Sequence, residues 1–200
     1  MLSNFHETSQ TQQPLIIKTK TMSLALRYLP HYTIEDYKRW EGDWELINGI
    51  AYAMSPSPTK KHQRLSLSLA RLFSDALEDA CPNCEIIQEL DWRVEENTVV
   101  RPDLMLICGE EDDDFVTSPP HLVIEILSPS TALKDKGLKH ELYQEQGVKY
   151  YLIADPKQEV LQVYELIEGA YQLKKAIKTG DFEFKIETCT FAVHFESLWK

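Results

Sequence analysis

The sequence predicts a single α/β domain with a central mixed β-sheet flanked by helices. One observation is an apolar stripe with helical spacing from Leu65 to Leu77, and the other is a pair of short, strongly apolar runs at 104–107 and 122–127. Runs of four to six apolar residues are typical of strands that are covered on both faces. With 200 residues, 43% of them hydrophobic, the chain is long enough for one well-buried core.

The first part of the chain predicts a lead-in, a short helix and a β-hairpin. Residues 1–25 are rich in Gln, Thr and Ser, so we expect a flexible lead-in, followed by one domain over residues 26–200. Thr33 to Asp36 resembles a capping box and would open a helix that Gly42 ends. Asn48-Gly49 is a strong hairpin signal, and the segments on either side would form two antiparallel strands, 44–47 and 50–54.

The remaining elements follow in chain order. The Pro- and Ser-containing segment 55–59 breaks the chain and supplies caps for a long helix to about Ala80, which carries His62 on its apolar face. After a turn at 81–84 we expect strands near 85–93, 99–107 and 121–127, a helix from about 131 to 146, and strands at 148–154, 160–166, 171–177 and 182–193.

Two carboxylates in the apolar runs need an explanation. Asp103 opens one run and Glu125 interrupts the other. A lone carboxylate in a buried segment costs several kcal/mol, roughly, unless it is paired, protonated or bound to a cation. Two such acids on adjacent strands can hold Mg²⁺ or Mn²⁺, because these hard cations prefer oxygen ligands. The simpler reading is that Asp103 begins a strand after a proline turn and that Arg101 or a backbone group satisfies Glu125.

Charge and cysteine content set limits on the function. The net charge of −11 is evidence against a protein that binds nucleic acid through its overall field, although local patches decide binding. Four cysteines in a chain of this length do not predict a disulfide framework, and Cys81 and Cys84 lack the second pair that a zinc site needs. We read them as a helix-ending turn around Pro82. No export signal or bilayer-spanning stretch is visible, so a cytoplasmic protein without a membrane partner is expected.

The third part of a metal-dependent hydrolytic site would be a cation that offsets developing negative charge. In the PD-(D/E)XK nuclease superfamily this cation is a lysine two residues after the glutamate, and Leu127 occupies that position here. Lys139, on the helix predicted after the Glu125 strand, could reach back to the same cluster, with Tyr143 one turn later. Alternatively, Lys139 pairs with Asp135 on a solvent-exposed helix face.

At this point the chain resembles the Uma-two family, a former domain of unknown function classed with restriction endonucleases in the PD-(D/E)XK superfamily. The resemblance covers roughly residues 28–165 and is specific as an ordered set of short motifs. The matching segments are Tyr32-Thr-Ile-Glu-Asp-Tyr37, Trp44-Glu-Leu-Ile-Asn-Gly49, Met54-Ser-Pro-Ser-Pro58 with His62, Val100-Arg-Pro-Asp103, Leu122-Val-Ile-Glu-Ile-Leu-Ser-Pro-Ser-Thr131, Lys139 with Tyr143, Gly147-Val148 and Tyr151-Leu-Ile-Ala-Asp-Pro156.

The resemblance implies a restriction-endonuclease-like core and a specific site. Asp103, Glu125 and the backbone carbonyl of Ile126 would be metal ligands, and Lys139 would be the migrated lysine. Glu45 is a further acid in an apolar strand, and we expect it to support metal or water binding unless alternation places it on the solvent face of the hairpin. His62 is a supporting residue if it lies near the acids, and a hydrogen-bonded core or cleft residue otherwise.

The sequence therefore predicts an Mg²⁺-dependent endonuclease that hydrolyses DNA phosphodiester bonds. A homodimer is an expectation by analogy, since two sites would cut two strands. The second hypothesis is a non-catalytic binding or assembly module that keeps the nuclease fold. The acidic net charge favours the module. The trio of Asp103, Glu125 and Lys139 favours the enzyme, since a scaffold has no reason to bury two acids.

Overall fold

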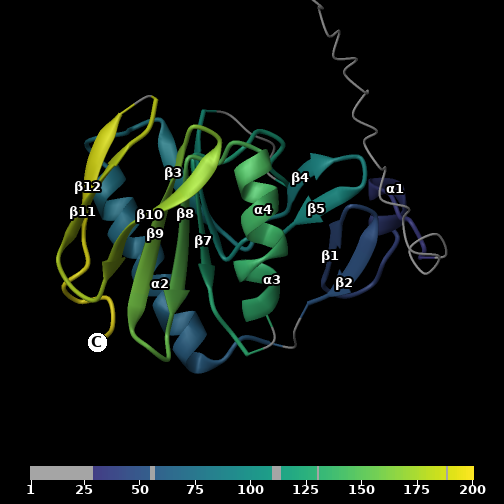
Figure 1. Ribbon diagram of the computed structural model, residues 1–200, viewed down its shortest axis with the longest axis horizontal. Coiled ribbons are helices and arrows are strands. Elements are labelled where there is room, and N and C mark those ends of the chain that lie inside the picture. The colour runs from purple at the N-terminus through teal and green to yellow at the C-terminus, as the bar shows by residue number, and fades with distance from the viewer. Residues whose placement is uncertain (1–28, 55–56, 110–113, 130, 188) are drawn as a thin grey trace, which may run out of the picture.

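Most of the chain is described in the computed structural model shown in Figure 1. The described residues are 29–54, 57–109, 114–129, 131–187 and 189–200. The predicted lead-in at 1–25 lies outside them, as do the first two residues of the segment that was expected to cap the long helix.

A six-stranded mixed sheet forms the centre of the protein, in the order β10-β9-β8-β7-β6-β3. Strands β7 and β8 are parallel, and all other neighbours are antiparallel. The strands span β3 (Cys84–Gln88), β6 (Leu104–Cys108), β7 (Leu122–Ile126), β8 (Tyr150–Asp155), β9 (Val160–Ile167) and β10 (Ala170–Ile177). The predicted α/β class with a central mixed sheet is confirmed.

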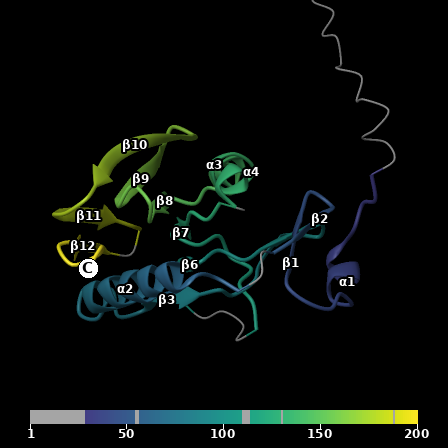
Figure 2. The same ribbon diagram turned by 90° about the horizontal axis from the view of Figure 1, so that it is seen from below.

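Helices cover both faces of this sheet, as Figure 2 shows. Helix α2 (Lys60–Leu77) lies against one face, and α3 (Ala132–Lys136) and α4 (Leu138–Glu145) lie against the other. Because successive side chains of a strand point to opposite faces, β6 contributes to two cores. Leu104 and Leu106 join the core that contains α2, whereas Met105 and Ile107 join the core that contains α4.

The predicted hairpin is present and belongs to a second sheet, in the order β2-β1-β5-β4. Asn48 and Gly49 have φ of 51° and 76°, the left-handed conformation that a two-residue turn of this kind requires at both positions. The hairpin strands and their partners are β1 (Trp44–Ile47), β2 (Ile50–Ala53), β4 (Trp92–Glu95) and β5 (Thr98–Val100), with α1 (Ile34–Tyr37) beside them.

Two predicted strands were wrong in extent, because each divides between the two sheets. The strand expected at 85–93 ends as β3 and resumes as β4, and Glu89 between them has φ of 50°, which interrupts an extended chain. The strand expected at 99–107 is β5 followed by β6, separated at Pro102, which has no N–H to donate to a ladder.

Helix boundaries also differ from the predictions. The helix expected from 131 to 146 is broken at Gly137, which has non-helical φ and ψ of −121° and −91° and separates α3 from α4. Helix α1 ends at Tyr37, before Gly42, and α2 ends at Leu77, with Thr59 as its N-cap accepting from the His62 N–H. None of the described helices is long and apolar enough to cross a lipid bilayer.

The C-terminal part of the chain packs on α2. Strands β11 (Asp181–Lys185) and β12 (Thr190–His194) form a hairpin, where one strand had been expected. Phe73 of α2 lies at the centre of this contact, with its ring 5.4 to 6.3 Å from the rings of Phe184, Phe191 and Phe195. This aromatic cluster fixes the hairpin to the helix.

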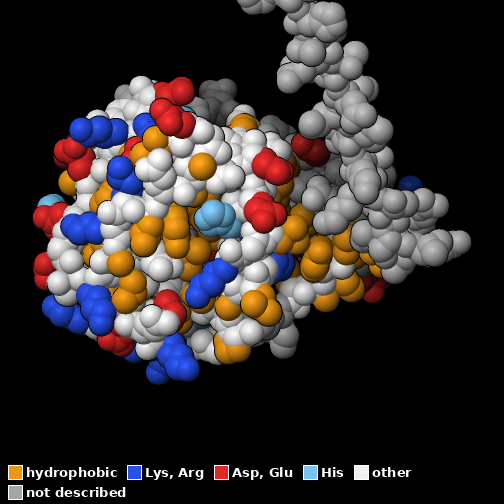
Figure 3. Space-filling model, viewed as in Figure 1, with side chains coloured by type: hydrophobic (Ala, Val, Ile, Leu, Met, Phe, Trp, Pro, Cys, Tyr) orange, Lys and Arg blue, Asp and Glu red, His pale blue; other side chains and the backbone are white. Residues whose placement is uncertain are grey.

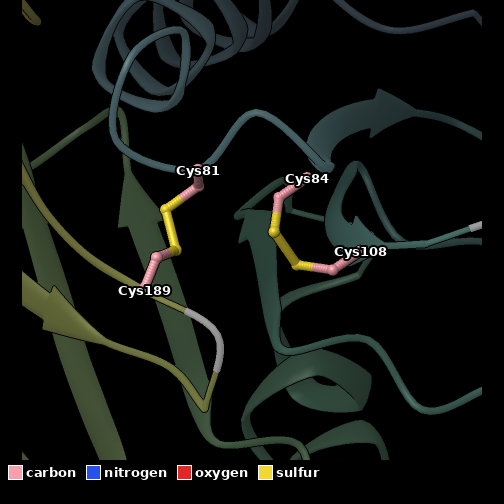
Figure 4. The surroundings of a disulfide bond; sticks show 4 residues. All are labelled: Cys81, Cys84, Cys108 and Cys189. Carbon is pink, nitrogen blue, oxygen red and sulfur yellow. A yellow bond between two sulfur atoms is a disulfide. The ribbon is translucent and has the colours of Figure 1, made fainter.

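The four cysteines form two disulfides, so the expectation of no disulfide framework was wrong (Figure 4). Cys81, directly after α2, is bonded to Cys189 between β11 and β12, and Cys84 is bonded to Cys108 on the neighbouring strand β6. The expected turn is present, since the Cys84 N–H donates to the Cys81 carbonyl. The turn brings each cysteine to a separate partner that is distant in sequence.

Phe73 offers a test of this packing. Phe73→Ala should lower the free energy of unfolding by roughly 3–5 kcal/mol, because it removes a fully buried ring and leaves a cavity between α2 and the hairpin. Leu67→Ala on the exposed face of the same helix is the matched control and should change stability by less than about 0.5 kcal/mol. Urea denaturation measures both. Equal losses would contradict the packing described.

Candidate active site

A cavity of about 490 Å³ lies where the N-terminus of α2, the ends of β6 and β7, and α3 meet. Its size is that of a small-ligand site. Asp103, Glu125 and Lys139 all line it, together with Glu45 and His62. Residues that are far apart in the sequence, and that were each selected as a candidate, are thus brought together in one place.

Lys139 is the centre of a buried ionic cluster. Its ammonium nitrogen Nζ lies 2.7 Å from Glu45 Oε1, 2.8 Å from Glu125 Oε1 and 4.0 Å from Asp135 Oδ1. All four residues are at most 3% exposed. The alternative reading placed Lys139 and Asp135 on a solvent-exposed helix face. It was therefore wrong, because both residues are buried. Burial alone would lower the pKa of Lys139, but the carboxylates of Glu125, Glu45 and Asp135 outweigh it and raise the pKa, so the amine stays protonated.

Two donors contact the same carboxyl oxygen of Glu125. The Lys139 ammonium and the Tyr143 hydroxyl, 2.7 Å away, both donate to Oε1. Burial raises the pKa of the Glu125 carboxyl to about 8, although Lys139 acts in the opposite direction. Arg101, considered as a partner for Glu125, instead pairs with Asp43 and Asp91. The Glu125 carboxyl thus has Lys139 as its cationic partner and does not gain a second positive charge from Arg101.

Glu45 does not lie on the solvent face of the hairpin, so the alternative that would have excluded it from the site does not apply. The side chain is fully buried and accepts hydrogen bonds from Lys134, from Lys139 and from the Arg101 backbone N–H at 3.0 Å. Burial would raise the pKa of Glu45, but the two lysines outweigh burial and lower it. Glu45 therefore acts as an anchor for two ammonium groups.

The Asp103 carboxylate contacts both β7 and α2. Its Oδ2 accepts a hydrogen bond from the Ile126 backbone N–H at 2.6 Å, which places it beside the strand that carries Glu125. Its Oδ1 lies 3.3 Å from His62 Nε2. Burial would lower the pKa of His62, but the hydrogen bond and charge of Asp103 outweigh it and raise the pKa. His62 is thus near the acids, which was the condition for a supporting role.

Two residues of the cluster were not among the predicted site residues. Lys134 lines the cavity and contacts Glu45, and Asp135 is almost fully buried beneath it. The i, i+4 spacing of Asp135 and Lys139 was visible in the sequence, but nothing local indicated that this helix face is buried. A further sign is structural, since Asp135 Oδ1 has no hydrogen-bond partner within the described parts of the chain.

The residues fit a cation that retains most of its water ligands. Among the described residues, no three side chains of His, Cys, Asp or Glu form a group that could hold a metal ion. However, Mg²⁺ is commonly bound through one or two carboxylates plus water. Within the described part of the chain, three buried carboxyls, Glu45, Glu125 and Asp135, face two ammonium groups, and Asp135 Oδ1 has no hydrogen-bond partner. The cluster therefore has room for additional positive charge.

The ionic cluster predicts a large stability difference between two lysines. Without divalent metal, Lys139→Ala should lower the free energy of unfolding by roughly 3–5 kcal/mol, because it leaves buried carboxylates without their main partner. Lys136→Ala, at an exposed position on α3, should change it by less than about 0.5 kcal/mol. Urea denaturation in the presence of a chelator compares the two variants. If they were equally stable, Lys139 could not be the centre of the cluster.

Comparisons with known proteins identify the family of the chain and support its fold. The Uma2 family model, described as "Putative restriction endonuclease", matches residues 34–185. The uncharacterized protein slr1290 of Synechocystis sp. is 28% identical over an alignment of 176 residues, and this alignment covers 82% of this chain and 90% of that protein. A crystal structure from Anabaena variabilis, of a "putative nuclease belonging to DUF820", matches with a TM-score of 0.63 and 16% identity over 78% of this chain and 89% of the other, which bears on the fold alone. Since the family model spans most of the chain and includes Asp103, Glu125 and Lys139, the protein belongs to the Uma-two (Uma2) family.

Proposed function

We propose that the protein is a divalent-metal-dependent endonuclease that hydrolyses phosphodiester bonds of DNA. One observation carries the proposal. Lys139 follows Glu125 by 14 residues, yet its ammonium donates to the Glu125 carboxylate at 2.8 Å, in the same cavity as Asp103. The lysine that the nuclease motif lacks on the strand is thus supplied from a helix. Membership of a family whose description is "Putative restriction endonuclease" supports the same reading.

Each residue of the site has a separate role in the proposed reaction. Asp103, Glu125 and the Ile126 carbonyl would hold Mg²⁺ or Mn²⁺, which when bound acidifies a water molecule and polarises a phosphoryl oxygen. Lys139, protonated because of its acidic neighbours, offsets negative charge that develops on the phosphoryl group. Tyr143 orients the Glu125 carboxylate through its hydroxyl, and His62 orients Asp103.

The walls of the cavity support a phosphate-containing substrate despite the acidic composition. Over the whole chain, acidic residues outnumber basic ones by 32 to 21. In the cavity wall the numbers are equal, with Glu45, Glu89, Asp103, Glu125 and Asp135 against Lys61, Arg101, Lys134, Lys139 and Lys157. A bound divalent cation would make this local charge positive, which favours a phosphodiester. A homodimer in the cytoplasm, with one site for each strand, completes the proposal.

A binding or assembly module with the nuclease fold is the second candidate. The net charge of −11 favours it. On the face seen in Figure 3, acidic and basic side chains are interspersed among the described residues, without a continuous basic surface for a long duplex. The buried cluster favours the enzyme, since burying three carboxyls costs stability that binding alone does not require.

A cleavage assay separates the two candidates. Wild-type protein with Mg²⁺ or Mn²⁺ should nick supercoiled plasmid DNA, and Asp103→Asn or Glu125→Gln should lower the rate by roughly 10² or more, because each removes a charged ligand of the cation. Glu141→Gln, at an exposed position on α4, is the control and should retain the wild-type rate. The absence of cleavage by wild type over a range of salt concentrations would leave the module as the function.

A further inference from the structure

Asp135 has an unusual environment for a carboxylate. The residue is 1% exposed, it lines the cavity, and its Oδ1 has no hydrogen-bond partner among the described residues. A buried carboxylate oxygen without a partner costs several kcal/mol, roughly, so such a position needs a compensating interaction in some state of the protein. The question is which group supplies it.

The Thr131 side chain hydrogen-bonds the Asp135 carboxyl group but leaves Oδ1 without a hydrogen bond, and the Lys139 ammonium is the charged donor beside that oxygen. The Tyr151 hydroxyl, at 2.9 Å, donates to the backbone carbonyl of Asp135 and so is not available to its side chain. Lys134 is engaged with Glu45. The Lys139 ammonium is 4.0 Å from Asp135 Oδ1, just beyond hydrogen-bond distance, and two of its three N–H donors are directed to Glu45 and Glu125. A small movement of Lys139 would close this gap.

A divalent cation at Glu125 would cause that movement. In the metal-free protein the ammonium donates to the same Glu125 carboxyl group that would bind the cation. Lys139 and Tyr143 both donate to Oε1 of Glu125, and a divalent cation bound to the same carboxyl group would lie close to the ammonium. Two positive charges at such short range in a buried site repel strongly, which favours movement of the ammonium away from Glu125. The ammonium then needs another anion, because a buried ammonium without one is costly. Asp135, on the preceding turn of the chain, has the vacant acceptor.

We propose that Asp135 is a positioning residue which accepts a hydrogen bond from Lys139 when a divalent cation binds at Glu125. Lys139 then has two positions, one on Glu125 without metal and one on Asp135 with metal, and Glu45 holds it in both. The inference rests on the proposed function, since it requires a cation at Glu125. It adds that Asp135 sets the affinity of the site for metal by accommodating the displaced lysine.

A thermodynamic cycle on Mn²⁺ binding tests this role without any measurement of activity. Isothermal titration calorimetry with Mn²⁺ alone should show that Asp135→Asn weakens binding by roughly tenfold or more, the scale seen for residues that support metal ligands. In a Lys139→Met background, where no ammonium has to be displaced, Asp135→Asn should change the affinity by less than about twofold. Asp135→Glu, which keeps the carboxylate, should recover most of the wild-type affinity. Glu141→Gln is the control for the loss of a negative charge.

Each other outcome is decisive. An equal loss with and without Lys139 would show that Asp135 acts directly on the metal and would overturn the proposal, as would an unchanged affinity of Asp135→Asn in the wild-type background. Either result would leave the nuclease function intact, whereas no Mn²⁺ binding by wild type would overturn both. If Lys139→Met fails to fold, a crystal structure of wild type with Mn²⁺ decides the matter. Lys139 Nζ should lie about 2.8 Å from Asp135 Oδ1, and its retention on Glu125 would refute the two-position model.

Discussion

The arrangement of this protein depends on one buried ammonium group. Lys139 on α4 contacts Glu45 of β1 and Glu125 of β7, so a single side chain connects the hairpin sheet, the central sheet and the helix layer. Buried ion pairs are weak sources of net stability but are very sensitive to the loss of one partner. The same contacts that fix three elements relative to one another therefore also define the position of the charged groups in the cavity.

Much of this could be predicted from the sequence because the signals were local or came from a family resemblance. The Asn48-Gly49 hairpin follows from the backbone conformation of two residues, and the acids Asp103 and Glu125 were conspicuous within apolar runs. The convergence of Lys139 with them on one cavity was one of two readings of the residues, and the resemblance favoured it.

What could not be predicted depends on contacts between distant segments. Cys81 and Cys189 are 108 residues apart, and no local pattern indicates that they meet. Alternation along a hairpin cannot show which face a second sheet and a helix will cover, so the sequence left the burial of Glu45 open. The burial of the helix face that carries Asp135 and Lys139 was left open for the same reason, since burial is a property of what packs against a residue and not of the residue itself.

The central sheet also separates two hydrophobic cores, one on its α2 side and one on its α4 side. The two cores differ in the roles that their side chains have. On the α2 side, Phe73 packs against the rings of Phe184, Phe191 and Phe195, which carry no polar group, so volume-conserving replacements there alter stability alone. On the α4 side, Tyr143 and Tyr151 pack in the core while their hydroxyls bond to Glu125 and to the Asp135 carbonyl. Residues of the core on the α2 side can therefore vary among relatives as long as they pack. Residues of the core on the α4 side must both pack and keep their hydrogen bonds. Sequence divergence within the family should accordingly be faster on the α2 side of the sheet than on the α4 side.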